Sequence, residues 1–252
     1  MKKLRIRILS LLLVLVWLPT LMISPLAADT VIASGECGAA SDNVVWTLTS
    51  DRTLTISGSG NMADFASSIS SPWQSYKDMI LKVVIEEGIT SIGKYAFYSC
   101  ANLTQATIHN GVASIGDYAF NETGLTQINL PEGLETICYG AFYRCRRLSQ
   151  ITFPETLTTI DQFAFASCTE LNFTELPSSL KSIKNAAFSG CWKLSLTQLP
   201  EGLTSIGESA FSECGKLALT SLPTGITKIG YATFASCTSL SQLYLHLSLI
   251  HI

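Results

Sequence analysis

Apolar positions recur with a fixed period along most of the chain. From Ile80 onward the sequence divides into units of 22 or 23 residues, of which LTQINLPEGLETICYGAFYRCRR is representative. Apolar side chains stand at positions 1, 4, 6, 10, 13, 17 and 18 of that unit. The units begin at Ile80, Leu103, Leu125, Leu148, Leu171, Leu194, Leu217 and Leu240. Because a period of this length is typical of a solenoid, seven complete units and a broken eighth are predicted to stack over residues 80–246.

Two columns of this repeat have no exception in the seven complete units. One is aromatic and comprises Phe97, Phe120, Phe142, Phe165, Phe188, Phe211 and Phe234. The other is aliphatic and comprises Ile92, Ile115, Ile137, Ile160, Ile183, Ile206 and Ile229. A single short unit has no partner to cover its apolar faces, so each unit is expected to bury them against its neighbours.

The order of residues within a unit predicts its local structure. The Leu-x-x-Ile-x-Leu part should form a strand that pairs in parallel with the equivalent strands above and below it, at about 4.8 Å. Proline follows this part at Pro131, Pro154, Pro177, Pro200 and Pro223. Since proline lacks an N–H group, it ends strand pairing and turns the chain. The Ala-Phe part is expected to form a short helical or 3-10 turn with its ring inside, so the fold class predicted is a mostly β repeat solenoid.

The residues before the repeats, 29–79, do not show the period. Residues 45–49 and 53–57 alternate between apolar and polar side chains and are separated by Ser50, Asp51 and Arg52. This alternation predicts a β-hairpin. The first coil of a solenoid has an apolar edge that needs cover, so we favour an N-terminal cap over the alternative of an independent binding domain.

The first 28 residues have the composition of a signal peptide. Lys2, Lys3, Arg5 and Arg7 precede an uncharged apolar run over residues 8–23, and Ala27 and Ala28 offer a cleavage site before Asp29. The chain is therefore expected to be secreted or cell-surface, with no membrane insertion once residues 1–28 are removed. A transmembrane anchor is the alternative interpretation, although the apolar run is short for a membrane span.

The repeats resemble the BspA-like leucine-rich-repeat family. The resemblance rests on IGKYAF at residues 92–97, IGDYAF at 115–120 and IGESAF at 206–211, and it extends over the whole repeat region. The glycine of this motif is replaced by Cys138, Asp161 and Lys184 in three units. The segment from Cys37 to Trp73 is similar to the one that precedes the repeats in many members. The resemblance implies a right-handed coil with a parallel strand ladder.

Composition restricts the classes of partner. The net charge is −3 and 14% of the residues are charged. Removing the four basic residues of the leader leaves a more acidic chain, which argues against nucleic acid or an anionic membrane as the main partner. A surface with so few charges must be rich in Ser, Thr, Asn and Gln, which suits an extracellular protein.

Six of the eight cysteines stand in one column of the repeat. They are Cys100, Cys145, Cys168, Cys191, Cys214 and Cys237, while Cys37 and Cys138 lie outside the column. Side chains in one column point the same way, whereas a disulfide needs side chains that turn toward each other. Buried reduced thiols are therefore predicted, with the disulfides that export would permit as the alternative. No CxxC pair or histidine cluster accompanies the column, so no metal or other cofactor is expected.

Candidate catalytic residues are few, and no enzymatic activity is predicted. The histidines are His109, His246 and His251, which suggest no catalytic triad. Glu132, Glu155 and Glu201 stand beside prolines and are interpreted as solvated turn residues. A glycosidase-like pair of carboxylates across two coils is the enzymatic alternative.

Ligand binding is expected at positions 3 and 5 of the strand, which point outward if positions 4 and 6 face the core. These residues are Gln105 and Thr107, Gln127 and Asn129, Gln150 and Thr152, Phe173 and Glu175, Leu196 and Gln198, and Leu219 and Ser221. From Leu171 onward position 3 is apolar and position 4 is threonine. Either an apolar stripe is exposed there for a partner, or the strand shifts locally so that position 3 turns inward.

Residues 247–252, LSLIHI, break the repeat and match the translation of a sequencing-library end sequence. They are interpreted as an adapter, which would make the true protein longer. The resemblance implies adhesion through host or bacterial surface proteins or glycans, with the chain as a monomer. Two alternatives remain: a structural spacer that presents a lost C-terminal domain, and the non-catalytic part of a carbohydrate-active enzyme.

Overall fold

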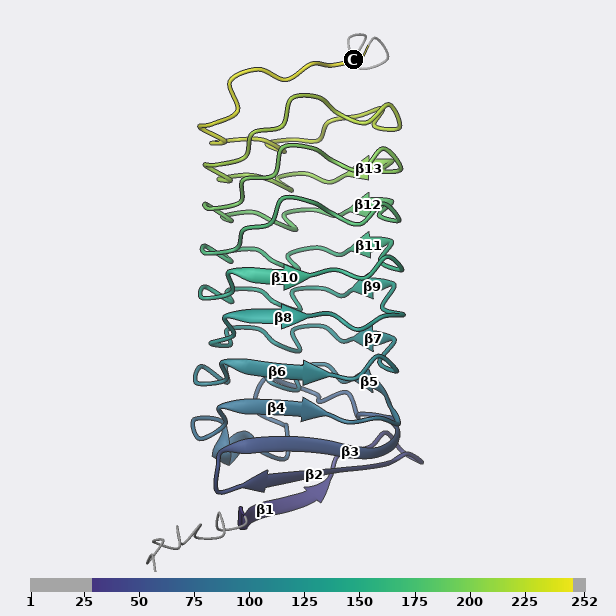
Figure 1. Ribbon diagram of the computed structural model, residues 1–252, viewed down its shortest axis with the longest axis vertical. Coiled ribbons are helices and arrows are strands. Elements are labelled where there is room, and N and C mark those ends of the chain that lie inside the picture. Colours follow the sequence, from purple (N-terminus) through teal and green to yellow (C-terminus); the bar gives the residue numbers. More distant parts are fainter. Residues whose placement is uncertain (1–28, 247–252) are drawn as a thin grey trace, which may run out of the picture.

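The repeated apolar pattern produces two parallel ladders of short strands, one on each side of a continuous core (Figure 1). The computed structural model describes residues 29–246, so the predictions for residues 1–28 and 247–252 lie outside the described part. The first ladder contains β4 (Lys82–Ile85), β6 (Gln105–Ile108), β8 (Gln127–Asn129) and β10 (Gln150–Thr152). The second contains β5 (Ile89–Ile92), β7 (Ser114–Ile115), β9 (Thr136–Ile137), β11 (Thr159–Ile160), β12 (Ser182–Ile183) and β13 (Ser205–Ile206).

Equivalent residues of successive units pair with each other in both ladders, although β8 and β10 form a separate two-stranded sheet that is not paired with β6. Gln127 lies opposite Gln150 in the first ladder, and Ile160 lies opposite Ile183 in the second. The chain is therefore the mostly β solenoid that the period predicts. The second ladder follows the isoleucine column. It was not predicted as strand, because in most coils only two residues pair there, which is too short for an alternating sequence pattern.

The N-terminal region joins the first ladder directly. β1 (Val31–Glu36), β2 (Asn43–Thr49) and β3 (Thr53–Asn61) pair in antiparallel order. The long strand β3 then pairs in parallel with β4 and, near its end, with β5. Leu54 and Ile56 of β3 are fully buried. One strand thus covers the edge of both ladders at the first coil.

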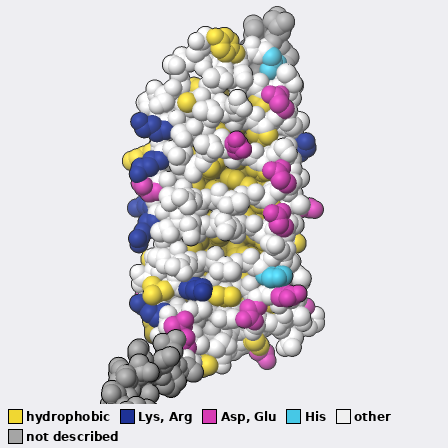
Figure 2. Space-filling model, viewed as in Figure 1, with side chains coloured by type: hydrophobic (Ala, Val, Ile, Leu, Met, Phe, Trp, Pro, Cys, Tyr) yellow, Lys and Arg dark blue, Asp and Glu magenta, His cyan; other side chains and the backbone are white. Residues whose placement is uncertain are grey.

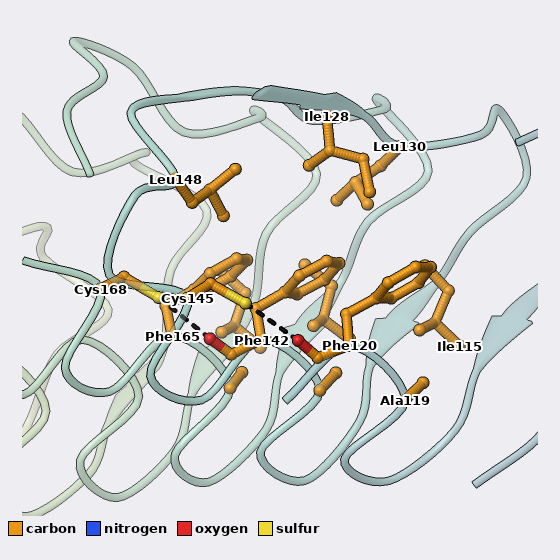
Figure 3. Packing of buried hydrophobic residues seen from close by; sticks show 14 of the residues in the cluster. Ile115, Ala119, Phe120, Ile128, Leu130, Phe142, Cys145, Leu148, Phe165 and Cys168 are labelled. Atoms are coloured by element: carbon orange, nitrogen blue, oxygen red, sulfur yellow. Dashed lines mark hydrogen bonds between the residues drawn. The ribbon is translucent and has the colours of Figure 1, made fainter. Parts of the chain in front are cut away.

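The phenylalanine column forms one stacked row inside the solenoid (Figure 3), as the sequence predicts. Neighbouring ring centroids from Phe97 to Phe234 lie 5.0 to 5.9 Å apart. Trp73 extends the row below the first coil, since its ring stacks on Phe97 at 5.6 Å and is completely buried. Its indole Nε1 donates a hydrogen bond of 2.8 Å to the Ala96 carbonyl.

The Ala-Phe segments are not helical, so the predicted helical turn is wrong. In the first coil Tyr95 and Ser99 have positive φ, and equivalent residues of every later coil do too. The N–H groups of Tyr95, Phe97 and Ser99 donate to carbonyls of the next coil. Backbone groups that a helix would pair internally are therefore satisfied by the neighbouring coil. Among the described residues, the 3-10 helix η1 (Gln74–Tyr76) lies ahead of the repeats.

These bonds between the Ala-Phe segments all run the same way. At each of six successive coil interfaces, three N–H groups donate toward the C-terminal neighbour. In the first coil, the Lys94 carbonyl accepts from the Phe65 N–H and the Ala96 carbonyl accepts from Trp73. The N-terminal region therefore supplies donors for two of the three carbonyls that no earlier coil satisfies.

Replacing Trp73 by phenylalanine is expected to lower the free energy of unfolding by about 1–3 kcal/mol, because the Ala96 carbonyl loses its donor while most of the apolar contact remains. Chemical denaturation measures the loss, and hydrogen exchange should locate it in the first coil. The exposed Trp192, replaced by phenylalanine, is the control and should change stability little. Equal effects of the two substitutions would contradict the capping role of Trp73.

All eight cysteines are free thiols, and the six of the column are buried, as predicted. The Sγ of Cys145 donates to the Phe120 carbonyl at 3.0 Å, and that of Cys168 donates to the Phe142 carbonyl at 3.0 Å (Figure 3). Cys191, Cys214 and Cys237 repeat this contact. Each of these five thiols thus bonds to the backbone carbonyl of the phenylalanine in the preceding coil, which links successive units of the aromatic row.

Candidate binding face

The ladder face is the outward side of β4, β6, β8 and β10 together with the equivalent segments of later coils. In β6, β8 and β10, positions 3 and 5 are exposed, as the sequence predicts, at Gln105, Thr107, Gln127, Asn129, Gln150 and Thr152. Strand geometry puts alternate side chains on opposite faces, and Ile128 of β8 correspondingly lies in the core. The pairing register aligns these polar residues in rows along the stack, and Thr152 donates to the Oδ1 of Asn129 at 2.9 Å.

The apolar side chains at position 3 of the later coils are not an exposed stripe. Leu196 is 0% exposed and Leu219 is 1% exposed, so their prediction as ligand-binding residues is wrong. Phe173 is half-buried and packs edge-on against Phe153, with 5.2 Å between ring centroids. The alternative interpretation, a local shift that turns position 3 inward, is the one the structure shows. Thr174, Thr197 and Thr220 are exposed in their place.

This shift also explains why the first ladder has no strand beyond β10 among the described residues. Side chains of a regular strand alternate, so positions 4 and 6 can both face the core. In the later coils positions 3 and 6 both face inward, as Leu196 and Leu199 do. Positions of opposite parity cannot lie on one face of a regular strand, and the backbone departs from strand geometry. Glu175, Gln198 and Ser221, at position 5, remain exposed as predicted.

Replacing Leu196 by alanine is expected to lower the free energy of unfolding by about 2–5 kcal/mol, because it leaves a cavity in the core. Thr197→Ala, one residue away on the outer side, should change stability by less than about 0.5 kcal/mol. Urea denaturation of the two variants measures both. A larger loss for Thr197→Ala than for Leu196→Ala would show that the predicted exposed stripe exists after all.

Three hollows lie along the ladder face where its strands end. The first, about 530 Å³, includes Ile108 and His109 in its lining. The second, about 390 Å³, lies beside Phe153 and Phe173, and the third, about 540 Å³, lies beside Leu199. Figure 2 shows apolar surface in the centre of this face between bands of polar side chains. The face therefore offers apolar recesses separated by rows of hydrogen-bonding groups.

Charged side chains gather on opposite edges of the ladder face (Figure 2). The acidic edge, in the turns that follow the strands, consists of the exposed Glu86, Glu87, Glu132, Glu155 and Glu201. The basic edge, in the turns that precede them, consists of the exposed Arg146, Arg147, Lys193 and Lys216. From the sequence alone, each glutamate is interpreted as a solvated turn residue, and an acidic edge is not predicted. The spacing of one repeat between Glu132 and Glu155 indicates that these two side chains lie on the same edge of the stack.

The described residues contain little that suggests a catalytic or metal centre. Residues 29–246 hold no group of three or more His, Cys, Asp and Glu side chains placed to bind a metal ion. His109 is exposed, and its Nδ1 accepts a hydrogen bond of 3.2 Å from the Gly111 N–H. Across the same residues, no helix has the length and apolar character needed to span a membrane.

Comparison with solved structures finds bacterial leucine-rich-repeat proteins. A leucine-rich repeat protein from Eubacterium ventriosum is 22% identical, with 86% of this chain and 80% of that chain covered and a TM-score of 0.44. The T. pallidum leucine rich repeat protein is 24% identical, with 79% of this chain and 77% of that chain covered and a TM-score of 0.48. The pneumococcal vaccine antigen PcpA is 18% identical, with 87% and 71% covered and a TM-score of 0.47.

No curated protein sequence matches the chain. The model of the BspA type leucine rich repeat region matches residues 68–191 and 158–252, with six copies of the repeat. The matched region holds the stacked phenylalanines and begins ahead of Trp73, which the structure places in the same aromatic row. The chain therefore belongs to the BspA-type leucine-rich-repeat family.

Proposed function

We propose that this chain is a secreted or cell-surface interaction module that binds a protein partner across the ladder face, and that it is not an enzyme. The observation that carries the proposal is the unequal distribution of charge on that face, with glutamates along one edge and mainly arginines and lysines along the other, where Lys193 pairs with Glu170. The basic and apolar leader over residues 1–28 supports export.

The chemistry of the ladder face suits a folded protein partner. Opposite charges on two edges favour one orientation of a partner with the reverse pattern and speed its encounter. The apolar hollows between the edges can receive side chains that anchor the complex. The exposed amide groups of Gln127, Asn129 and Gln150 provide hydrogen bonds between these anchors. A broad surface of this kind supports adhesion more readily than catalysis.

Binding of the purified chain to immobilised fibronectin, laminin and collagen tests the proposal. At least one of these proteins is expected to bind, and binding should weaken as the salt concentration rises because exposed charges are screened. The triple variant Glu132→Gln, Glu155→Gln and Glu201→Gln should reduce the association rate by about tenfold.

The matched control is Glu213→Gln, which removes one exposed carboxylate of an Ala-Phe segment, away from the ladder face. It should leave binding unchanged. Failure to bind any of the three proteins, or equal binding by the triple variant and the unmodified chain at low salt, would overturn the assignment of the ladder face.

A further inference from the structure

A second row of aromatic rings lies outside the core, on the Ala-Phe segments. Tyr95 stacks on Tyr118 with 5.3 Å between ring centroids and 15° between ring planes. Tyr118 contacts Tyr139 edge-on at 5.2 Å, and Tyr139 contacts Phe163 at 5.5 Å. All four rings are half-buried, so each keeps part of its surface in contact with solvent.

The solenoid itself does not require aromatic side chains at these positions. The column that contains Tyr95 and Tyr118 holds Ala186, Ser209 and Ala232 in later coils, with the same positive φ. Gly140 belongs to this column too, and a Cβ atom there would lie 2.7 Å from the Tyr118 ring. The third coil thus makes room for the Tyr118 ring. The backbone of the solenoid is therefore maintained in this column without a tyrosine side chain.

Polar groups lie beside the aromatic row. Arg144 Nη1 bonds Glu122 Oε1 at 2.9 Å, and Ser99 donates to the other carboxylate oxygen at 3.1 Å. The guanidinium carbon of Arg144 lies 4.9 Å from the centre of the Tyr143 ring. The hydrogen bond from Arg144 lowers the pKa of the Glu122 carboxyl, so the pair stays charged and is neutral as a whole.

The first two rings of the aromatic row and the Glu122–Arg144 pair line one hollow of about 430 Å³, here called the tyrosine hollow. Its lining includes Tyr95, Tyr98, Tyr118, Tyr143, Glu122 and Arg144. Asn121 lines it as well; this side chain is 2% exposed, and its Oδ1 has no hydrogen-bond partner among the described residues. A buried acceptor without a donor is costly, so the Asn121 side chain is a polar group of the lining whose hydrogen bonding is incomplete.

We propose that the tyrosine hollow is a binding site for neutral glycans and that one or two pyranose rings of the glycan contact its lining. The C–H faces of a sugar ring pack on the exposed tyrosine surfaces, as apolar groups pack on aromatic rings elsewhere. Sugar hydroxyls donate to Glu122 and accept from Arg144, which together offer acceptors and donors in a fixed geometry. The volume falls within the range of small-molecule sites.

The observations favour a neutral sugar over an acidic one or a peptide. Glu122 already compensates the charge of Arg144, so an anionic ligand gains little. The hollow is small and is bordered by Ala66, Ser67 and Ser68, which limits the access of a folded partner. In Figure 3 the Ala-Phe segments lie across the core from β8, so the tyrosine hollow is remote from the ladder face and does not depend on the protein-binding proposal.

A printed array of neutral glucose-, galactose-, mannose- and N-acetylglucosamine-based oligosaccharides, with sialylated chains included, tests the inference on the full chain. At least one neutral series is expected to bind and the sialylated chains are not expected to bind better. Titration calorimetry with the best tetrasaccharide should show that Tyr118→Ala and Tyr143→Ala each weaken binding by about tenfold. Both variants should fold, because later coils carry alanine in the same columns, at Ala186 and Ala166.

The matched control is Tyr231→Ala, which removes an 82% exposed tyrosine from a later Ala-Phe segment and should leave the affinity unchanged. The glutamine triple variant of the ladder face should also bind the sugar normally, which separates this site from the proposed function. The inference is overturned if no neutral oligosaccharide binds, if the two tyrosine variants bind as well as the unmodified chain, or if they lose a protein partner instead of a sugar.

Discussion

Raising the pH from 8 to 11 under reducing conditions is expected to unfold the protein cooperatively, because burial disfavours the ionised form of five of the six thiols of the cysteine column. Cys145 is the exception, since hydrogen bonds from Cys168 and Thr123 outweigh its burial and lower the pKa of its thiol. Burial raises the pKa of the Cys100 thiol to about 12. Burial also raises the pKa of Cys168, Cys191, Cys214 and Cys237. An unfolded cysteine titrates near its ordinary value of about 8.5, so the unfolded chain loses these protons first.

This difference in proton binding makes the folded state less stable as the pH rises. A thiol whose pKa is higher in the folded state contributes stability that is fully present below about pH 8.5 and is lost as the pH rises toward the folded-state pKa. Each such thiol removes about 1.4 kcal/mol of stability per pH unit in that window. Several thiols together therefore remove stability on the order of 10 kcal/mol by pH 11, which is comparable with the whole stability of a typical domain.

Guanidinium denaturation at pH 8, 9, 10 and 11, followed by tryptophan fluorescence, measures this loss. The control is a chain with Cys100→Ser, Cys191→Ser and Cys214→Ser, in which a hydroxyl group that does not titrate replaces the thiol donor. The structure already holds a hydroxyl in this column, at the buried Thr123. The serine variant should lose stability with pH more slowly, and superimposable curves for the two proteins would contradict the role of the thiols.

The second large effect is expected at the centre of the aromatic row. Phe142→Ala should lower the free energy of unfolding by about 3–5 kcal/mol, because a fully buried ring is removed and its neighbours cannot close the gap. The ring of Phe142 stacks on Phe120 at 5.4 Å and on Phe165 at 5.3 Å. The loss should be largest in the coils that contain these rings, since each unit of a solenoid contacts only its neighbours.

Thermal and chemical denaturation give the size of the Phe142 effect, and hydrogen exchange gives its position along the stack. Trp192→Ala is the matched control, because this aromatic side chain is 59% exposed and should contribute less than about 0.5 kcal/mol. A loss below about 1 kcal/mol for Phe142→Ala would mean that the row is not the main source of stability in these coils.

The parts of the fold that could be predicted are those that the period alone determines. Phe120, Phe142 and Phe165 recur at a constant spacing, and stacking of the units necessarily brings them together. The buried column of cysteines follows from the same spacing. Trp73 could not be found in this way, because it lies outside the register of the repeats and joins the aromatic row only through the path of the chain before β4.

The conformation of the Ala-Phe segments could not be predicted from local sequence. Positive φ favours glycine, and glycine occupies the two positive-φ columns of the repeats at Gly140 and Gly190 alone. Tyr95 and Ser99 carry no such signal, so the pattern suggested a helical turn. What holds these residues is the set of hydrogen bonds to the next coil, which no single unit contains.

The candidate site was predicted only in part, for a related reason. Polar residues at positions 3 and 5 indicate an outward face in β6, β8 and β10, where alternation is regular. At Leu196 and Leu219 the apolar spacing changes, and the sequence allowed both an exposed stripe and an inward shift. Core burial decides between them. The two charged edges and the tyrosine hollow depend on contacts between coils and were not anticipated.

The aligned hydrogen bonds of the Ala-Phe segments have a consequence for association between molecules. The rows make the solenoid directional: acceptors point toward β1 and donors point away from it. Exposed backbone groups of this kind can recruit another chain and lead to polymers. The Phe65 N–H and the Trp73 indole bond to the carbonyls of Lys94 and Ala96, so two of the three acceptors that the first coil presents on this side already have a donor within the chain. Contacts within the chain thereby disfavour end-to-end association of solenoids at the end of the stack that carries β1.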